Sequence, residues 1–183
     1  MAATSIRQLA TADLTDDEIR AVRRLLWAAF EGEEGGEFTE DDWQHGLGGI
    51  HVIGSVDGRI VAHGSVVGRE IHVGGRPLAT GYVEAVAVDP AEQRRGHGTA
   101  VMRDVGAIIT STFELGVLGT GEHGFYERLG WRTWQGPSYV RLPSGDEPTP
   151  DEDGYIMVLP TPITPSIDIH APISCDWRPG DVW

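Results

Sequence analysis

The chain has 183 residues, of which 40% are apolar, and it carries 28 acidic against 14 basic side chains, a formal charge of −14 at pH 7. The length fits one ordinary domain, and the apolar share is enough for a packed core. The charge argues against DNA or RNA as the main partner, because phosphate backbones are bound by concentrated positive charge. The negative charge suits a cationic ligand, although an acidic surface more commonly serves solubility alone.

Residues that form disulfides or bind metals are scarce or scattered. Cys175 is the single cysteine, so neither an internal disulfide nor a cysteine-based metal cluster is expected. The seven histidines lack metal-type spacing, and we predict no metal site. The first residues lack an apolar signal core, and no stretch approaches the roughly 20 apolar residues of a membrane helix. We therefore predict a cytoplasmic protein with no membrane partner.

Two helices are expected first along the chain. Thr15-Asp-Asp-Glu18 has the form of a capping box, and apolar residues follow it at helical spacing as far as Phe30. Thr39-Glu-Asp-Asp42 marks the start of a second, shorter helix, which Gly48 and Gly49 end.

Four antiparallel strands are expected next. Asp57-Gly58 joins the β-rich runs 50–56 and 59–67, which is the pattern of a tight hairpin. Residues 69–73, Gly74-Gly75 and the residues from Arg76 onward predict a second hairpin, which leads into the run from Tyr82 to Val88. Asp89-Pro90 ends this last strand.

The remaining elements alternate between helix and strand. They are a helix at 99–113, a strand at 115–119, a short helix at 123–129, and strands at 131–134 and 155–159. Residues 143–154 form a polar loop with five acids, and the chain after Pro160 is proline-rich and irregular. This order predicts an α+β fold. We expect a single domain over residues 1–183, with 160–183 as an irregular tail that folds back onto the domain.

A glycine-rich turn, Gln93-Arg-Arg-Gly-His-Gly98, lies between a predicted strand and a predicted helix. Gly96 and Gly98 let the backbone approach a ligand, and the free amides at a helix N-terminus favour phosphate or pyrophosphate. A tight turn with no ligand accounts for the same residues. The spacing is neither that of a P-loop nor that of a dinucleotide fold.

The turn also carries a Gln/Arg-x-x-Gly-x-Gly/Ala signature, and in this it resembles the acyl-CoA N-acyltransferases of the GNAT superfamily. The element order from Thr15 to Leu159 is similar to that fold, a mostly antiparallel central sheet flanked by helices. The resemblance implies acetyl-CoA as co-substrate, with its pyrophosphate on the loop and its pantetheine arm along the preceding strand. The cofactor-binding residues that it implies are Val86, Ala87, Val88, Gln93, Arg94, Arg95, Gly96, His97 (mostly through its amide) and Gly98.

Five stretches narrow the resemblance to the aminoglycoside 2'-N-acetyltransferases of actinobacteria. They are residues 37–43, 81–88, 136–138, 149–154 and the final Cys-Asp-Trp-Arg-Pro-Gly-Asp-Val-Trp. The resemblance implies acetylation of the 2'-amine of aminoglycosides, which gives resistance, and it suggests a homodimer. Two alternatives stay open: acetylation of another polyamine or a peptide terminus, and a regulatory module that binds acetyl-CoA without turnover.

Two residues are candidates for the catalytic groups. Glu84 is the only charged residue from Tyr82 to Val88, and regular alternation puts it on the face of Tyr82 and Val86. An outward position on a half-exposed strand explains Glu84 equally, whereas the resemblance implies a base that acts through water. Tyr126 has the pattern of a packing aromatic, but the resemblance implies the general acid that protonates the departing thiolate. A phenol, with an unperturbed pKa of about 10, is protonated at neutral pH.

The acceptor side is expected to be acidic, because carboxylates can hold the ammonium groups of a polycation. The resemblance implies substrate contacts from Glu37, Glu84, Ala85, Gly119, Asp151, Glu152 and Trp183. The acids near residue 151 could equally be exposed charges with no ligand. Trp183 could equally serve only to cover an edge of the core.

Three of these substrate positions depart from the family. Glu37 and Glu152 stand where aspartate is expected, and Gly119 stands where serine is expected, so the preferred antibiotic can differ. The resemblance further implies that Trp183 contacts the drug through its α-carboxylate.

Overall fold

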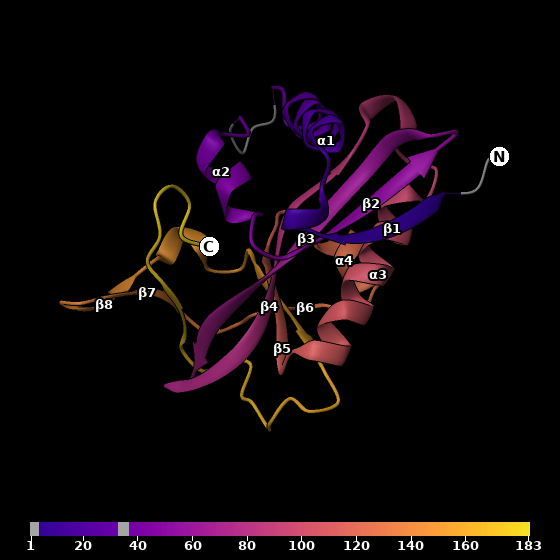
Figure 1. Cartoon of the computed structure of the whole chain (residues 1–183). Helices are drawn as coiled ribbons and strands as arrows, with labels where there is room; N and C mark the ends of the chain where they lie inside the picture. The colour runs from indigo at the N-terminus through magenta and orange to yellow at the C-terminus, as the bar shows by residue number, and fades with distance from the viewer. Residues whose placement is uncertain (1–3, 33–36) are drawn as a thin grey trace. The chain divides into compact units, whose positions relative to one another are not determined.

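The computed structural model describes residues 4–32 and 37–183. The chain divides into two compact units (Figure 1). The first contains the residues up to Val67 together with Val83–Val105, and the second contains Gly68–Tyr82 and Gly106–Trp183. Three elements contribute residues to both units: β3 (Arg59–Val73), β4 (Arg76–Val88) and α3 (His97–Thr112).

The sheet of the first unit begins with β1 (Ser5–Ala10), which pairs antiparallel with β2 (Ile50–Val56). β2 in turn pairs antiparallel with β3, with Ile53 opposite His63. The predicted hairpin is confirmed: Asp57 and Gly58 both have positive φ, +49° and +79°, as a primed two-residue turn requires. β1 was not predicted, because Ser-Ile-Arg-Gln-Leu-Ala is a mostly polar edge strand that buries little.

Both predicted helix starts are confirmed, each with a capping box. In α1 (Asp16–Ala29), Thr15 Oγ1 accepts from Glu18 N at 3.2 Å and the Glu18 carboxylate accepts from Thr15 N at 2.9 Å. α2 (Glu40–His45) has the same arrangement between Thr39 and Asp42. The apolar stripe of α1 packs into one core cluster with residues of α2 and the strands, whose buried members are Leu14, Val22, Leu25, Leu26, Phe38, Trp43, Ile53 and Ala87.

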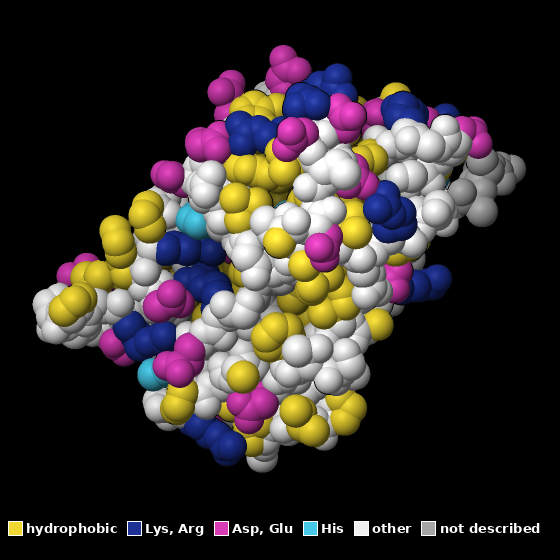
Figure 2. Space-filling model, in the orientation of Figure 1, with side chains coloured by type: hydrophobic (Ala, Val, Ile, Leu, Met, Phe, Trp, Pro, Cys, Tyr) yellow, Lys and Arg dark blue, Asp and Glu magenta, His cyan; other side chains and the backbone are white. Residues whose placement is uncertain are grey.

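The outer surface of α1 is charged, with both signs interspersed (Figure 2). Arg23 joins α1 to α2, because its guanidinium binds the Glu40 carboxylate through both terminal nitrogens, at 3.0 and 2.6 Å. The same guanidinium lies over the rings of Trp27 and Trp43, at 4.7 and 5.3 Å from their centroids. α2 is therefore held by ionic and aromatic contacts as well as by its buried tryptophan.

The second unit contains a longer mixed sheet and the short helix α4 (His123–Glu127). Two of its pairings are parallel, β4 with β5 and β10 with β7. The pairings of β10 with β3, β5 with β9, β6 with β9 and β7 with β8 are antiparallel, in agreement with the predicted, mostly antiparallel sheet. Its strands run in the order β6 (Arg132–Thr133), β9 (Ile156–Pro160), β5 (Leu115–Gly119), β4, β3, β10 (Ile173–Asp176), β7 (Ser138–Leu142) and β8 (Gly145–Pro148).

Several predicted boundaries were wrong. Residues 59–67 and 69–73 are one strand, β3, because Gly68 continues the extended backbone. β4 begins at Arg76, as predicted, and continues through the predicted run to Val88. The predicted polar loop 143–154 contains β8 and the 3-10 helix Pro150–Glu152, and β10 lies in the predicted irregular tail. Pro, Gly and acidic residues hide the strand pattern of β8, an exposed edge strand. β10 is buried between β3 and β7, but its four residues are too few to show a pattern. No helix within the described ranges is long and apolar enough to cross a membrane.

The irregular segment before β10 lies close against the backbone near Gly136. The amides of Gln135 and Gly136 both donate to the Ile169 carbonyl at 3.1 Å, and Trp134 Nε1 donates to the Ala171 carbonyl at 3.0 Å. A Cβ built on Gly136 would lie 2.0 Å from the Ala171 carbonyl oxygen. Only glycine therefore permits this approach of two backbones.

We predict that Gly136→Ala lowers the free energy of unfolding by roughly 1–3 kcal/mol, the usual cost of forcing extra volume into a packed site. Gly106→Ala is the matched control, because its Cβ would meet Leu159 Cδ2 at an ordinary 3.7 Å inside α3. There we expect a gain of about 0.5–1 kcal/mol from the higher helix propensity of alanine. Urea denaturation measures both, and equal effects of the two substitutions would contradict the prediction.

Candidate functional site

The glycine-rich loop joins β4 to α3 in the first unit. After Val88, the Asp89 carboxylate caps the 3-10 helix Pro90–Glu92 by accepting from Ala91 N at 2.9 Å. Arg94 and Gly96 then adopt positive φ, +59° and +88°. Left-handed residues just before a helix turn successive amides toward one point, which is the geometry of an anion-binding concavity.

The arginines around this loop differ in whether an ion pair already occupies them. The Arg59 guanidinium pairs with Asp89 and with Glu92, each at 2.6 Å, and Arg95 pairs with Glu92 at 2.9 Å. Arg94 is exposed and makes no ion pair with any residue of the ranges 4–32 and 37–183. A Cβ on Gly96 would meet no atom within 4 Å, so the loop has open space beside it. The loop therefore fits a phosphate group.

The side chain of His97 points into the first unit. It is buried, its Nδ1 lies 2.8 Å from Thr4 Oγ1, and its Nε2 lies 3.6 Å from the Glu92 carboxylate. The amide of His97 stands at the start of α3, as predicted, and the imidazole supports the loop.

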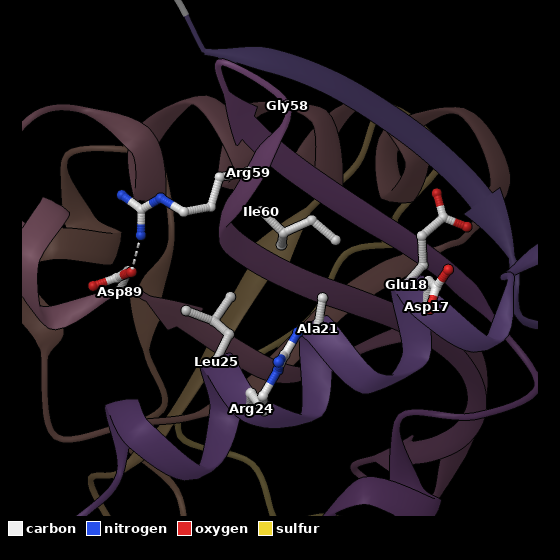
Figure 3. Close-up of a pocket in the computed structure, with 9 residues that line it drawn as sticks. All are labelled: Asp17, Glu18, Ala21, Arg24, Leu25, Gly58, Arg59, Ile60 and Asp89. Carbon is white, nitrogen blue, oxygen red and sulfur yellow. Dashed lines mark hydrogen bonds and ion pairs between the residues drawn. The ribbon is translucent and has the colours of Figure 1, made fainter.

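A surface hollow lies behind this loop in the first unit (Figure 3). Its floor is apolar, with Leu25 and Ile60, and the Arg59–Asp89 ion pair closes one side. None of the predicted site residues lines it, so we assign it no ligand.

β4 contains a bulge at Ala85, directly after the predicted base. Ala85 has φ +53°, a conformation that costs an alanine about 1–2 kcal/mol. The half-buried Glu84 precedes it, and the predicted regular alternation through this point is wrong. After the bulge, Ala87 packs into the core cluster under α1 and α2, whereas Val86 lies near Val101 and Val105 of α3, around the position that a Gly64 Cβ would occupy.

Side chains of β3 hold the two carbonyls at the bulge. Ser65 Oγ donates to the Glu84 carbonyl at 3.1 Å, and His63 Nδ1 donates to the Ala85 carbonyl at 2.7 Å. His63 Nε2 lies 2.9 Å from His51 Nδ1, and His51 Nε2 lies 2.9 Å from the Thr11 hydroxyl. Neither histidine belongs to a sequence motif that signals this arrangement.

The two histidines are uncharged. Burial lowers the pKa of His51 to about 4 and that of His63 to about 3, since an imidazolium in this interior would lose its hydration. Neither side chain is exposed to solvent.

The segment that carries Glu37 is anchored close to the same strands. Glu37 is exposed, while the next residue, Phe38, is buried against the rings of Trp27 and Phe30, at 4.9 and 5.4 Å between centroids. At the other end of α2, a Cβ on Gly46 would lie 3.0 Å from Ser65 Oγ and 3.8 Å from Ala85 Cβ.

The second unit holds Trp183 against the segment 149–153. The Trp183 indole is buried and donates from Nε1 to Thr149 Oγ1 at 3.0 Å. Thr149 Oγ1 also lies 2.7 Å from Ser138 Oγ, and the Asp153 carboxylate accepts from both the amide and the hydroxyl of Ser138 at 2.8 Å. Hydrogen bonds thus join three of the stretches that carry the family resemblance.

An acidic group forms beside the tryptophan. Burial, together with the charges of Asp181 and Asp151, raises the pKa of the Glu152 carboxyl. Asp181 Oδ1 accepts from Trp183 N at 3.1 Å, which fixes it beside the indole. Asp151, Glu152 and Trp183, each predicted as a substrate contact, are brought together here. Asp181 was missed, because only its position within the final nonapeptide could have indicated it.

The final residues are fastened by two arginines that stack on Tyr82. The guanidinium carbons of Arg69 and Arg178 lie 4.7 and 5.4 Å from the centre of the Tyr82 ring. Arg69 donates to the carbonyls of Asp176 and Val182 at 2.9 and 3.0 Å. Arg178 Nη2 lies 3.3 Å from the backbone oxygen of Trp183 and so competes for the oxygen predicted to bind an ammonium group.

The two tryptophans of the final nonapeptide differ. Trp183 is 4% exposed, whereas Trp177 is 58% exposed. The expectation that the tail buries its aromatic surface therefore holds for Trp183 only.

Tyr126 is buried in α4 with its ring edge-on to Phe125 and Trp131. Burial, and to a smaller extent the charge of Glu122, raises its pKa above the ordinary range, so the phenol remains a proton donor. Gly119 is exposed at the end of β5, and a Cβ there would lie 3.9 Å from Tyr82 Oη. The family's serine would therefore fit at this position.

The predicted residues divide between the units. The first contains Glu37, Glu84, Ala85, the strand end Val86–Val88 and the loop 93–98; the second contains Gly119, Tyr126, Asp151, Glu152 and Trp183. Cys175 is buried in the second unit, and burial raises the pKa of its thiol to about 11. Within the described residues no three His, Cys, Asp or Glu side chains group as metal ligands would.

Comparison with known proteins agrees with this geometry. Residues 11–134 match the family model of an acetyltransferase (GNAT) domain. An aminoglycoside 2'-N-acetyltransferase of Mycolicibacterium fortuitum is 39% identical over 181 residues, which is 97% of this chain and 91% of that protein.

Solved structures show the same fold at low sequence identity. A GNAT family N-acetyltransferase (YhbS) of Escherichia coli in complex with CoA is similar over 96% of this chain and 91% of its own, with a TM-score of 0.65 at 14% identity. A GNAT family acetyltransferase of Brucella melitensis in complex with acetyl-CoA gives a TM-score of 0.61 at 18% identity, over 92% of this chain and 95% of its own.

The buried histidines predict a loss of stability in mild acid. Their pKa values are lower in the folded state than the unfolded value of 6.5, so the unfolded chain binds more protons and stability falls as pH falls below about 6.5. As the pH falls from 6.5 to 5, the number of protons that the two histidines take up on unfolding should approach about two.

The measurement is the denaturation free energy of the wild type, His63→Asn and His170→Asn at several pH values in this range. His63→Asn should flatten the dependence, and replacement of the exposed His170 should not. Identical slopes in all three proteins would show that the buried pair does not titrate on unfolding.

Proposed function

Because the chain belongs to the GNAT acetyltransferase family, we propose that it transfers the acetyl group of acetyl-CoA to the 2'-amino group of an aminoglycoside, with resistance to the modified antibiotic as the consequence. The observation that carries the proposal is the 39% identity to a 2'-N-acetyltransferase, which covers 97% of the chain and 91% of that protein. A fold match alone would support only the family.

Acetyl-CoA is the proposed co-substrate of the first unit. The amides around Arg94, Gly96 and the start of α3 would hold its pyrophosphate, and Arg94 would add the one arginine charge of this loop that no described ion pair uses. The strand end Val86–Val88 would offer backbone groups to the pantetheine arm, as an added strand would require.

In the proposed reaction the 2'-amine attacks the thioester carbonyl carbon. Its ammonium first loses a proton through water to the Glu84 carboxylate, because only the neutral amine has a lone pair to donate. The C–N bond forms, the C–S bond breaks, and the departing thiolate takes the proton of Tyr126. The proton that the acylated nitrogen then loses passes through solvent to the Tyr126 phenolate, which restores the phenol. The raised pKa of Tyr126 keeps the phenol protonated at neutral pH, so its proton is present when the thiolate forms, while it also makes the phenol a weaker acid.

Transfer would be direct, within a complex of both substrates. Cys175 is buried, and its thiol stays protonated at neutral pH because of its raised pKa. That argues against a cysteine-bound acetyl group.

The acids would bind the remaining ammonium groups of the drug. Asp151, Glu152 and Asp181 lie near Trp183 in the second unit, and Glu37 stands exposed in the first. The raised pKa of Glu152 supports this assignment, because an approaching cation would relieve the repulsion among these carboxylates. A cytoplasmic location and a homodimer belong to the proposal as well, and sedimentation analysis would test the second.

Acetylation of a panel of amines tests the proposal directly. The purified protein is mixed with acetyl-CoA and with aminoglycosides, polyamines or peptides, and products are read by mass spectrometry. We expect a single acetyl addition to aminoglycosides that have a 2'-amine and none to those with a 2'-hydroxyl. Equal acetylation of aminoglycosides with a 2'-amine and of those with a 2'-hydroxyl would overturn the proposal. So would acetylation of polyamines or peptides but of no aminoglycoside.

Tyr126→Phe tests the acid. Removing the hydroxyl while keeping the ring should lower kcat by about 10²-fold, the lower range for general acid catalysis, with little change in acetyl-CoA affinity. Tyr139→Phe, which removes a half-buried phenol in the same unit, is the control and should keep wild-type kcat. Single-turnover rates separate chemistry from product release, and an unchanged rate in Tyr126→Phe would remove this residue from the mechanism.

A further inference from the structure

Two backbone carbonyls at the bulge in β4 accept hydrogen bonds from side chains of β3. A regular strand pairs such groups with a neighbouring backbone, but a bulge disrupts the ladder locally. Here the Glu84 and Ala85 carbonyls accept from side chains, Ser65 Oγ at 3.1 Å and His63 Nδ1 at 2.7 Å. A buried carbonyl that lost its donor would cost about 1–3 kcal/mol.

Hydrogen bonding fixes the proton on each imidazole. The Ala85 carbonyl can only accept, so neutral His63 carries its proton on Nδ1 and accepts at Nε2 from His51 Nδ1. His51 therefore accepts at Nε2 from the Thr11 hydroxyl, whose oxygen also accepts from Gly48 N at 2.9 Å. The row of hydrogen bonds joins the turn after α2 to the bulge.

This row cannot carry a proton to the site. It ends on a carbonyl oxygen, which does not take a proton at working pH, and both imidazoles are held neutral. Its effect is mechanical: it fixes the position of one carbonyl. An apolar side chain could fill the same space, yet it would leave that carbonyl without a donor, so the polar residues answer a need that packing does not.

The bulge matters for the reaction because of what flanks it. The proposed base, Glu84, directly precedes it, and the proposed acetyl-CoA strand, Val86–Val88, directly follows it. Rotation of the Ala85 peptide would redirect the Glu84 side chain and the Val86 amide together.

Resting on the proposed function, we propose that His63, supported by His51, and Ser65 are positioning residues, which hold the two bulge carbonyls and so set the direction of the Glu84 carboxylate and of the acetyl-CoA strand. They touch neither substrate in this account. Removal of either donor should lower kcat more than a substitution elsewhere that destabilises the fold equally.

The test uses His63→Leu, which removes the donor, and His63→Asn, whose amide nitrogen stands near the place of Nδ1. Ser65→Ala removes the second donor with little change in volume and decides the question if His63→Leu does not fold. Two controls match them: Thr80→Val deletes a buried hydroxyl that donates to a strand carbonyl at the same 3.1 Å, and Ile53→Val trims the buried residue opposite His63.

Melting temperature, kcat, KM for both substrates and calorimetric acetyl-CoA affinity are measured for every variant. We expect Ser65→Ala and His63→Leu to lose about tenfold in kcat, as small misplacements of a catalytic group do, and His63→Asn to regain most of the loss. The controls should keep kcat within about twofold at similar melting temperatures.

Ser65→Ala or a folded His63→Leu with the kcat of the controls would overturn the inference, and so would a His63→Asn no better than His63→Leu. If the wild type acetylates no aminoglycoside, the proposed function fails, and acetyl-CoA affinity then decides the inference alone. It predicts a dissociation constant raised at least about threefold in the donor variants only, and an affinity unchanged from the controls would overturn it.

Discussion

Ala85 occupies a backbone conformation that alanine avoids, and much of the first unit is arranged so that it can do so. The strand must bend at this point, and its carbonyls must still find donors in a dry interior. Ser65 and His63 supply those donors from β3, and Gly46 lets the end of α2 approach them closely. The strained residue is thus held by its surroundings, which is the situation expected of backbone strain at a functional site.

The second unit solves a different problem, that of holding an irregular segment in place. The final nonapeptide has little regular structure beyond β10, yet its backbone carbonyls are bound by Arg69 and Arg178, and its indole is bound by Thr149. Thr149 belongs to the same hydrogen-bonded group as Ser138 and Asp153. This explains physically why three separated stretches of sequence resemble one enzyme family together: each depends on the others for its hydrogen bonds.

Local signals predicted the parts of the fold that depend on local chemistry. Two capping boxes, the Asp57-Gly58 turn and the stop at Asp89-Pro90 all appear where predicted, because each satisfies backbone groups within a few residues. β7 and β8 form a local hairpin, which was missed because its exposed, proline-containing second strand lacks a strand pattern. β1 and β10 were missed, since these strands pair with distant partners, β1 with β2 and β10 with β3 and β7. The bulge was missed for the same reason: nothing in Glu84-Ala85-Val86 requires it, and its donors lie about twenty residues earlier in the chain.

The most direct test of the cofactor platform is hydrogen exchange of the backbone amides with and without acetyl-CoA, under conditions where calorimetry shows saturation. The account predicts that acetyl-CoA slows exchange at Val86–Val88 and at the loop amides from Arg94 to Gly98, where the backbone itself would bind the ligand. The amides of the exposed residues Gly145, Asp146 and Glu147 in β8 should exchange at the same rate in both states. Saturating acetyl-CoA that leaves the strand end and the loop unprotected would contradict the account.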